Sequence, residues 1–127
     1  MHCPAGCTES TATPQPAFVR WSHDVIAAGE KVGLDFAAPK KLGALLADAG
    51  YEDISVKWMN WPLGTWAKGA RNKQIGRWWA EDMKDVSRNA SALFTRVLGW
   101  KPDEFEVFAA EIAREIDSGK RHMWIEM

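Results

Sequence analysis

Two cysteines and a histidine open the sequence, in MHCPAGC, and they are the first residues whose types could do chemistry. His2, Cys3 and Cys7 offer soft metal ligands, but a structural zinc site needs four ligands and no second Cys or His pair follows. We therefore expect no metal site. We interpret residues 1–16 as a flexible lead and residues 17–127 as the folded region.

The sequence also shows no clear pattern of residues for acid–base catalysis. His23 and His122 could each act as a general base, but neither has an acidic or nucleophilic companion at a recognisable spacing. Solvent exposure or simple packing is the expectation for both. The charged run from Glu81 to Arg88 reads as a solvated helix face, because it mixes both signs at helical spacing. No catalytic residue is assigned.

The tryptophans raise the main question, because the chain has eight Trp and a single Tyr. Three of them surround the Pro-Leu-Gly turn in KWMNWPLGTW, residues 57–66. Most of the others suit packing, since an indole covers a large apolar area with its N–H at the rim. We expect core or half-buried positions for Trp21, Trp78, Trp79 and Trp100.

Composition and charge exclude some partners. The net charge is -1 and the isoelectric point is near 6.3, which gives no electrostatic reason to bind nucleic acid or an anionic membrane. No apolar run reaches the roughly 18 residues that a membrane span needs, and no signal peptide is visible. The expected location is cytoplasmic.

Periodicity predicts an α+β content of about four helices and two short strands. Helices are expected over 17–32, from Pro39 to a cap at Gly50, from 71 to Gly99 with a break near Asn89, and from Pro102 to Gly119; the strands are expected over 52–60 and 121–127. One domain of this length can bury a single core.

A family resemblance emerges from the blocks AGYEDISVKWMNWPLGTW, LFTRVLGW with its downstream acidic helix, and RHMWIEM. The sequence over residues 17–127 resembles the C-terminal part of the fungal LaeA-like (velvet-associated, UMTA-type) S-adenosylmethionine-dependent methyltransferases. The resemblance implies an α+β fragment of a Rossmann-like class I methyltransferase, with the helix after strand five, strands six and seven, and the helical insertion between them. It also implies that the two strands pair as a small two-stranded antiparallel sheet. It also implies a role in secondary metabolism and allows a nuclear location.

The cofactor half that the resemblance implies is missing. Family members bind the methyl donor at a Gly-x-Gly loop after the first strand, where glycine lets the backbone approach the ligand. Here no two glycines are separated by one residue. We expect no cofactor-binding residue in this chain, and S-adenosylmethionine binding only if a methyltransferase-like partner completes it. In the family, strand seven lies between strands five and six, so the last strand is expected to lack one neighbour.

The resemblance also suggests where an acceptor would bind. Trp61 and Trp66 fall on the loop that follows strand six, which belongs to the insertion roofing the acceptor pocket in the family. With Trp78 they form the predicted substrate pocket, in which flat indoles would stack on an aromatic or polycyclic compound.

Three functions stay open at this point. The chain is a methyltransferase-like protein of secondary metabolism that cannot bind the donor alone, or a non-catalytic subunit of a split methyltransferase or regulatory complex. The third alternative is a cofactor-independent binder or cyclase of a small hydrophobic metabolite. A pocket closed by the three tryptophans would favour that third alternative.

Overall fold

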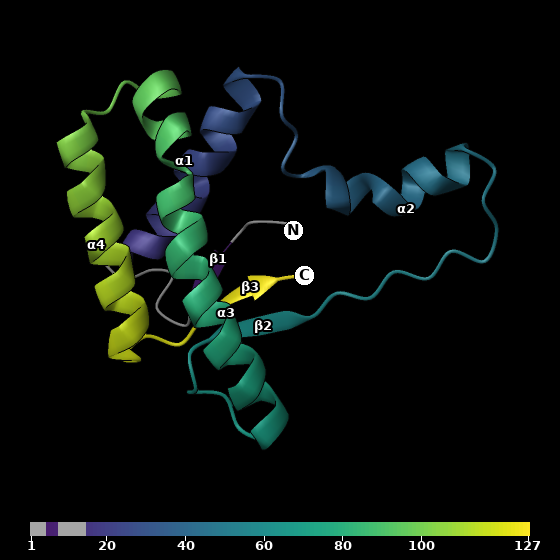
Figure 1. Cartoon of the computed structure of the whole chain (residues 1–127). Helices are drawn as coiled ribbons and strands as arrows, with labels where there is room; N and C mark the ends of the chain where they lie inside the picture. Colours follow the sequence, from purple (N-terminus) through teal and green to yellow (C-terminus); the bar gives the residue numbers. More distant parts are fainter. Residues whose placement is uncertain (1–4, 8–14) are drawn as a thin grey trace.

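The computed structural model describes residues 5–7 and 15–127, and it confirms the α+β fold with four α-helices (Figure 1). A single π-helical turn, η1, lies between the last two of them. The elements in chain order are β1 (Ala5–Cys7), α1 (Ala17–Lys31), α2 (Ala38–Asp48), β2 (Asn60–Leu63), α3 (Ala70–Asn89), η1 (Leu93–Val97), α4 (Pro102–Ser118) and β3 (Met123–Glu126).

The predicted antiparallel pairing of the last strand with the strand before the insertion is confirmed. Strand β3 pairs antiparallel with β2, with Trp61 opposite Ile125 and Leu63 opposite Met123. A third strand extends the sheet: β1 pairs antiparallel with the other side of β3, giving the order β1-β3-β2. The expectation that the last strand lacks a neighbour is therefore wrong, because residues 5–7, assigned to the lead, fill that side.

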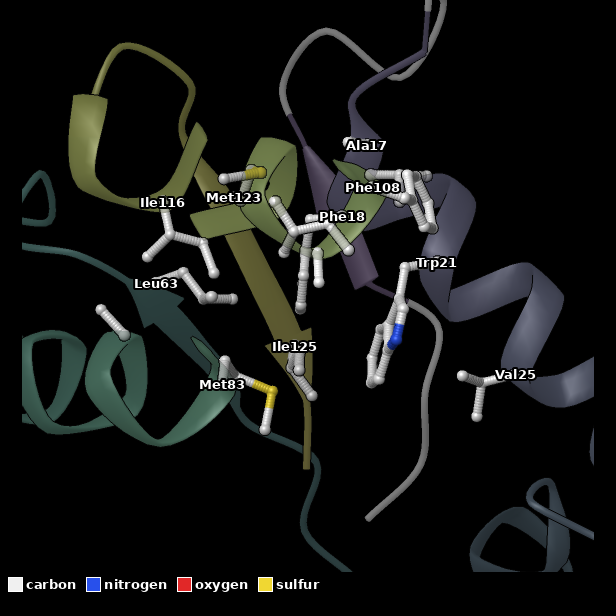
Figure 2. Close-up of a cluster of buried hydrophobic side chains, with 14 of the residues drawn as sticks. Ala17, Phe18, Trp21, Val25, Leu63, Met83, Phe108, Ile116, Met123 and Ile125 are labelled. Carbon is white, nitrogen blue, oxygen red and sulfur yellow. The ribbon is translucent and has the colours of Figure 1, made fainter. Parts of the chain in front are cut away.

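One face of the sheet carries the hydrophobic core. Figure 2 shows Leu63, Met123 and Ile125 pointing into a cluster with side chains from the helices. Trp21 of α1 and Met83 of α3 belong to the same cluster, and all five side chains are at most 3% exposed. Since successive strand residues point to opposite faces, Asn60, Pro62 and Trp124 lie on the other side of the sheet.

The helix boundaries follow the sequence signals closely. Helix α3 ends at Asn89 and Gly99 has φ 76°, so both the break and the glycine stop are confirmed. Gly119 ends α4 in the left-handed conformation, as expected of a glycine C-cap. Helix α1 has no capping side chain of its own; instead Glu115 of α4 accepts a 3.2 Å hydrogen bond from the Phe18 N–H, which ties the start of α1 to α4.

A glycine sets the distance between α3 and β2. The Gly64 N–H donates a 2.9 Å hydrogen bond to the Gly76 carbonyl, so the helix backbone touches the end of the strand. A Cβ on Gly76 would collide with the Gly64 carbonyl oxygen and lie 2.9 Å from the Gly64 carbonyl carbon. Only a residue without a side chain permits this approach. Helix α3 is thereby fixed against the sheet, with Trp79 beside β2.

Helix α2 stands away from the other helices and has no buried residue (Figure 1). Its apolar stripe is left open, since Leu42 and Leu45 are 52% and 54% exposed. The strand predicted over 52–60 is wrong for residues 52–59, which follow α2 without regular structure. The last backbone pair of the ladder joins Met59 to Met127, so β3 offers no partner to the residues before Met59. Their alternating pattern is present, but a strand needs a neighbour.

Candidate functional site

An apolar pocket lies between β2 and α3. It has a volume of about 430 Å³ and is lined by Trp61, Ile75, Trp78, Trp79 and Asp82. Trp61 comes from β2, and the other four occupy positions i, i+3, i+4 and i+7 of α3, which share one helix face. We call it the indole pocket.

The indoles of this pocket differ in burial. Trp79 is 9% exposed and packs edge-on against Trp61, with ring centroids 5.5 Å apart and planes at 86°. Trp78 is 65% exposed, so the expectation that it is core or half-buried is wrong: at its place on α3 the ring faces outward over the pocket. The exposed Trp78 indole beside the half-buried Trp61 and the buried Trp79 gives a surface on which a flat ligand can stack.

The Trp79 Nε1 donor is buried and has no hydrogen-bond partner among the described residues. Buried polar groups in folded proteins nearly always have a partner, because an unmade hydrogen bond costs about 1–3 kcal/mol. The buried, unpartnered Trp79 Nε1 is thus an energetic cost to the fold, and it lies at the wall of the indole pocket.

A second hollow, of about 340 Å³, lies on the opposite face of the sheet. It is lined by Trp66 and Trp124 together with other residues of β2 and the turn and helix that follow it. The Trp66 Nε1 donates a 3.1 Å hydrogen bond to the Met123 carbonyl, and its ring stacks on His122 with centroids 4.6 Å apart. Trp66 is therefore held against β3, and His122 is exposed and stacks on the Trp66 ring, in line with the expectation of solvent exposure or simple packing.

A polar hollow of about 350 Å³ adjoins both of these at the edge of β2. It shares Trp61 and Ile75 with the indole pocket and Asn60 and Asn72 with the hollow at Trp66, and it contains Arg71. The β2–α3 junction thus offers an apolar end near Asp82 and a polar end near Arg71.

The structure brings together two of the three predicted pocket residues. Trp61 and Trp78 line the indole pocket, whereas Trp66 lies on the other face of the sheet in the hollow with Trp124. Sequence reasoning placed Trp79 in the core only and did not single out Asp82 or Ile75. The helical spacing of these residues from Trp78 was a signal that could have found them.

Of the titratable groups that the structure describes, Lys84 and Asp35 have shifted pKa values, and both make structural contacts. The pKa of Lys84 is raised, first by its hydrogen bond to Asp117 of α4 and then by that to Glu81, at 2.9 Å and 3.0 Å. The pKa of Asp35 is lowered, chiefly by its hydrogen bond from Lys41 at the start of α2. Neither group lies in a pocket lined by the tryptophans, so neither marks an acid–base centre.

The structure gives no metal site among the residues it describes: no three His, Cys, Asp or Glu side chains there lie close enough to hold an ion. His2 and Cys3 lie outside the described residues, and of Cys7 only the backbone in β1 is described. His23 is exposed, as expected. Of the described helices, none combines the length and apolar character needed to cross a membrane.

Comparison with known proteins finds fungal methyltransferases. Methyltransferase pytC of Aspergillus terreus is 29% identical over 108 residues, which cover 84% of this chain and 33% of that protein. Probable methyltransferase tdiE of Emericella nidulans is 24% identical over 123 residues, covering 95% of this chain and 39% of that protein. Secondary metabolism regulator LAE1 of Pyricularia oryzae is 26% identical over 106 residues, which cover 81% of this chain and 32% of that protein.

The chain therefore spans about a third of the length of the curated relatives it matches. No protein-family model matches it, and no solved structure shows significant similarity. The similarity to methyltransferases holds over most of this chain at low identity. The α+β architecture agrees with a fragment of a methyltransferase-like fold.

Proposed function

We propose that this chain supplies the acceptor side of an S-adenosylmethionine-dependent methyltransferase of secondary metabolism and does not bind the donor alone. A donor-binding part, on the same or on a separate polypeptide, completes it. The observation that carries this proposal is the sheet order β1-β3-β2, in which β3 runs antiparallel to both neighbours. The last strand of a Rossmann-like methyltransferase lies in the same way between strands five and six, as the resemblance implies.

The start of α1 supports the absence of a donor site. In Rossmann-like proteins the ligand binds where a glycine-rich turn leads from a strand into a helix N-terminus. By the resemblance α1 corresponds to the helix after strand five and not to the helix that follows the donor-binding turn, and residues 8–16, which lead into it, contain no glycine. Its Phe18 N–H already donates to the Glu115 carboxylate, and this negative charge disfavours the carboxylate of an amino-acid cofactor at the same place. We therefore expect no S-adenosylmethionine binding by the chain alone.

The open edge of β1 and the exposed apolar face of α2 support the proposal that further strands complete this sheet. Among the described residues, β1 has a strand on one side only, and an open strand edge pairs readily with another strand. Helix α2 presents Leu42 and Leu45 to solvent, although its amphipathic pattern is that of a helix packed on a core. Both features would be covered by the sheet of a complete methyltransferase.

The same features favour the second candidate, a non-catalytic subunit of a split methyltransferase or regulatory complex. In that case β1 and α2 form the surface that binds the methyltransferase-like partner. The third candidate, a cofactor-independent binder or cyclase of a hydrophobic metabolite, has weaker support. This candidate would be favoured by one pocket closed by the three tryptophans. In the structure, however, Trp66 lies on the opposite face of the sheet from Trp61 and Trp78.

Complementation tests the proposal. The chain is mixed with a polypeptide comprising Methyltransferase pytC without the segment that the chain matches, and association is followed by size-exclusion chromatography and S-adenosylmethionine binding by calorimetry. We expect a complex that binds the donor. The doubly substituted variant Leu42→Glu/Leu45→Glu should prevent association yet remain folded, because both side chains are exposed. Equal association of this variant would refute the role of α2.

A further inference from the structure

The indole pocket has a charge as well as an apolar wall. Asp82 lies one helical turn from Trp78 and Trp79 on the same face of α3, at the rim of the pocket. Its carboxylate is exposed and makes no hydrogen bond or ion pair with any residue that the structure describes. The nearby cation Lys84 is already bound by Glu81 and Asp117. The negative charge of Asp82 is therefore available to a ligand.

The positive residue of the neighbouring hollow does not neutralise Asp82. Arg71 precedes Asp82 by eleven positions on α3, which corresponds to about 16 Å along the helix axis. This separation exceeds the Debye length of about 8 Å at physiological ionic strength, so the two charges act separately. An anionic group is disfavoured at the Asp82 end of the junction.

We propose that the indole pocket binds a compound with a flat apolar body and an ammonium group, with the ammonium facing Asp82 and the indole faces. A cation is attracted by the negative face of an aromatic ring, most strongly that of Trp, and also by a carboxylate beside it. The apolar body lies against Ile75 and Trp61. This inference deepens the proposed function, on which it rests for the role of the ligand as methyl acceptor.

The pocket suits such a ligand in size and in accessibility. Its volume of about 430 Å³ accommodates a bicyclic aromatic group with a short side chain, and pockets for small molecules begin at roughly 300 Å³. Trp78, at 65% exposed, can cover a ligand without any change in the core. Trp79 is fixed by its edge-on contact with Trp61, so the inner wall is already formed.

Two probes of equal shape test the charge requirement. Naphthylmethylamine is protonated at neutral pH, and naphthylmethanol is its neutral counterpart. Each is titrated into the nitrogen-labelled chain, and the indole N–H signals, assigned by single substitutions, report binding without any methyl donor. We expect the amine to bind about five- to tenfold more tightly than the alcohol, as an exposed ion pair together with a cation–π contact would give. The signals of Trp61, Trp78 and Trp79 should shift most.

Variants separate the roles of charge and ring. Asp82→Asn should reduce the preference for the amine to the roughly two- to threefold that the cation–π contact alone gives, and should leave the affinity for the alcohol unchanged. Glu106→Gln, which removes the same charge from an exposed site on α4, should keep the preference. Trp78→Ala should weaken the binding of both probes. This variant should keep the native fold, because the Trp78 ring is exposed.

Equal affinity of the two probes for the wild-type chain, a preference that is undiminished in Asp82→Asn, or shifts confined to other tryptophans would each overturn the inference. Such a result would leave the proposed function untouched, since that depends on donor binding and complementation. Conversely, donor binding by the isolated chain would refute the proposed function without affecting the amine preference.

Discussion

The substitution Gly76→Ala tests whether α3 is fixed on β2 by direct backbone contact. In an exposed helix this change stabilises, because Ala has the higher helix propensity, by about 0.8–1 kcal/mol. Here the new Cβ would collide with the Gly64 carbonyl oxygen and lie 3.3 Å from the Pro62 carbonyl oxygen. These atoms belong to the backbone and cannot rotate away, so the helix must shift.

The expected size of the effect follows from three contributions. Overpacking in a core costs typically about 1–3 kcal/mol. Moving α3 also lengthens the Gly64 to Gly76 hydrogen bond, which contributes about 0.5–1.5 kcal/mol. After subtracting the propensity gain, we expect Gly76→Ala to lower the free energy of unfolding by about 2 kcal/mol. For a chain of this size the melting temperature then falls by roughly 6–10 °C.

Gly43→Ala is the matched control, since it makes the same change in a helix. Its Cβ meets only the Val56 Cγ2 at 3.3 Å, and Val56 is 52% exposed and free to move. Thermal unfolding by circular dichroism should give a melting temperature at or slightly above that of the wild type for Gly43→Ala, because of the gain in helix propensity, and a lower one for Gly76→Ala. In the latter, the indole signals of Trp61 and Trp79 should also shift. A Gly76→Ala variant as stable as the wild type would refute the close-contact account.

Three further predictions concern the helix ends and contacts. Lys84→Met should lower the free energy of unfolding by about 1 kcal/mol at neutral pH. Because the pKa of Lys84 is raised in the fold, its contribution to stability is present below pH 10.5 and is lost as the pH rises above it. The urea midpoints of wild type and variant should therefore converge in strong alkali. Glu115→Ala should cost about 1 kcal/mol by uncapping α1 at Phe18, whereas Glu111→Ala on the same helix should not, and equal urea midpoints would contradict the cap. Gly99→Val should cost about 1 kcal/mol or more because Gly99 has φ 76°, and unchanged thermal unfolding would remove that explanation.

The local signals of the sequence predicted the helices well. Apolar spacing at three and four residues, a proline at the first helical position and glycine at the C-cap are all decided within a few neighbouring residues. For this reason α1 and α4 match their predictions within a residue or two, and the break near Asn89 is also confirmed.

The strands were harder because pairing is decided by distant residues. The alternation of Ile54, Val56 and Trp58 is a true strand pattern, yet these residues lie beyond the end of the ladder with β3. Strand β1 has only three residues, Ala5–Cys7, and its composition gives no strand signal; it pairs because β3 offers an open edge. Such pairings cannot be read from one segment alone.

The candidate site was only partly predictable for the same reason. Trp61 and Trp78 were named from the sequence, and their meeting depends on the contact of Gly76 with Gly64, which brings α3 onto β2. Trp66 lies beyond the end of β2, and its place in the other hollow depends on its contacts with Met123 and His122, which are more than fifty residues away in the sequence. Asp82 was read as part of a solvated face, and it is exposed, but it also borders the pocket.

Isothermal titration of the purified chain with S-adenosylmethionine tests the central claim most directly. We expect no saturable binding by the chain alone, because the sequence contains no Gly-x-Gly loop to hold the donor. Saturable binding with one site per chain would contradict it, because the donor would then be held by residues to which the account gives no such role.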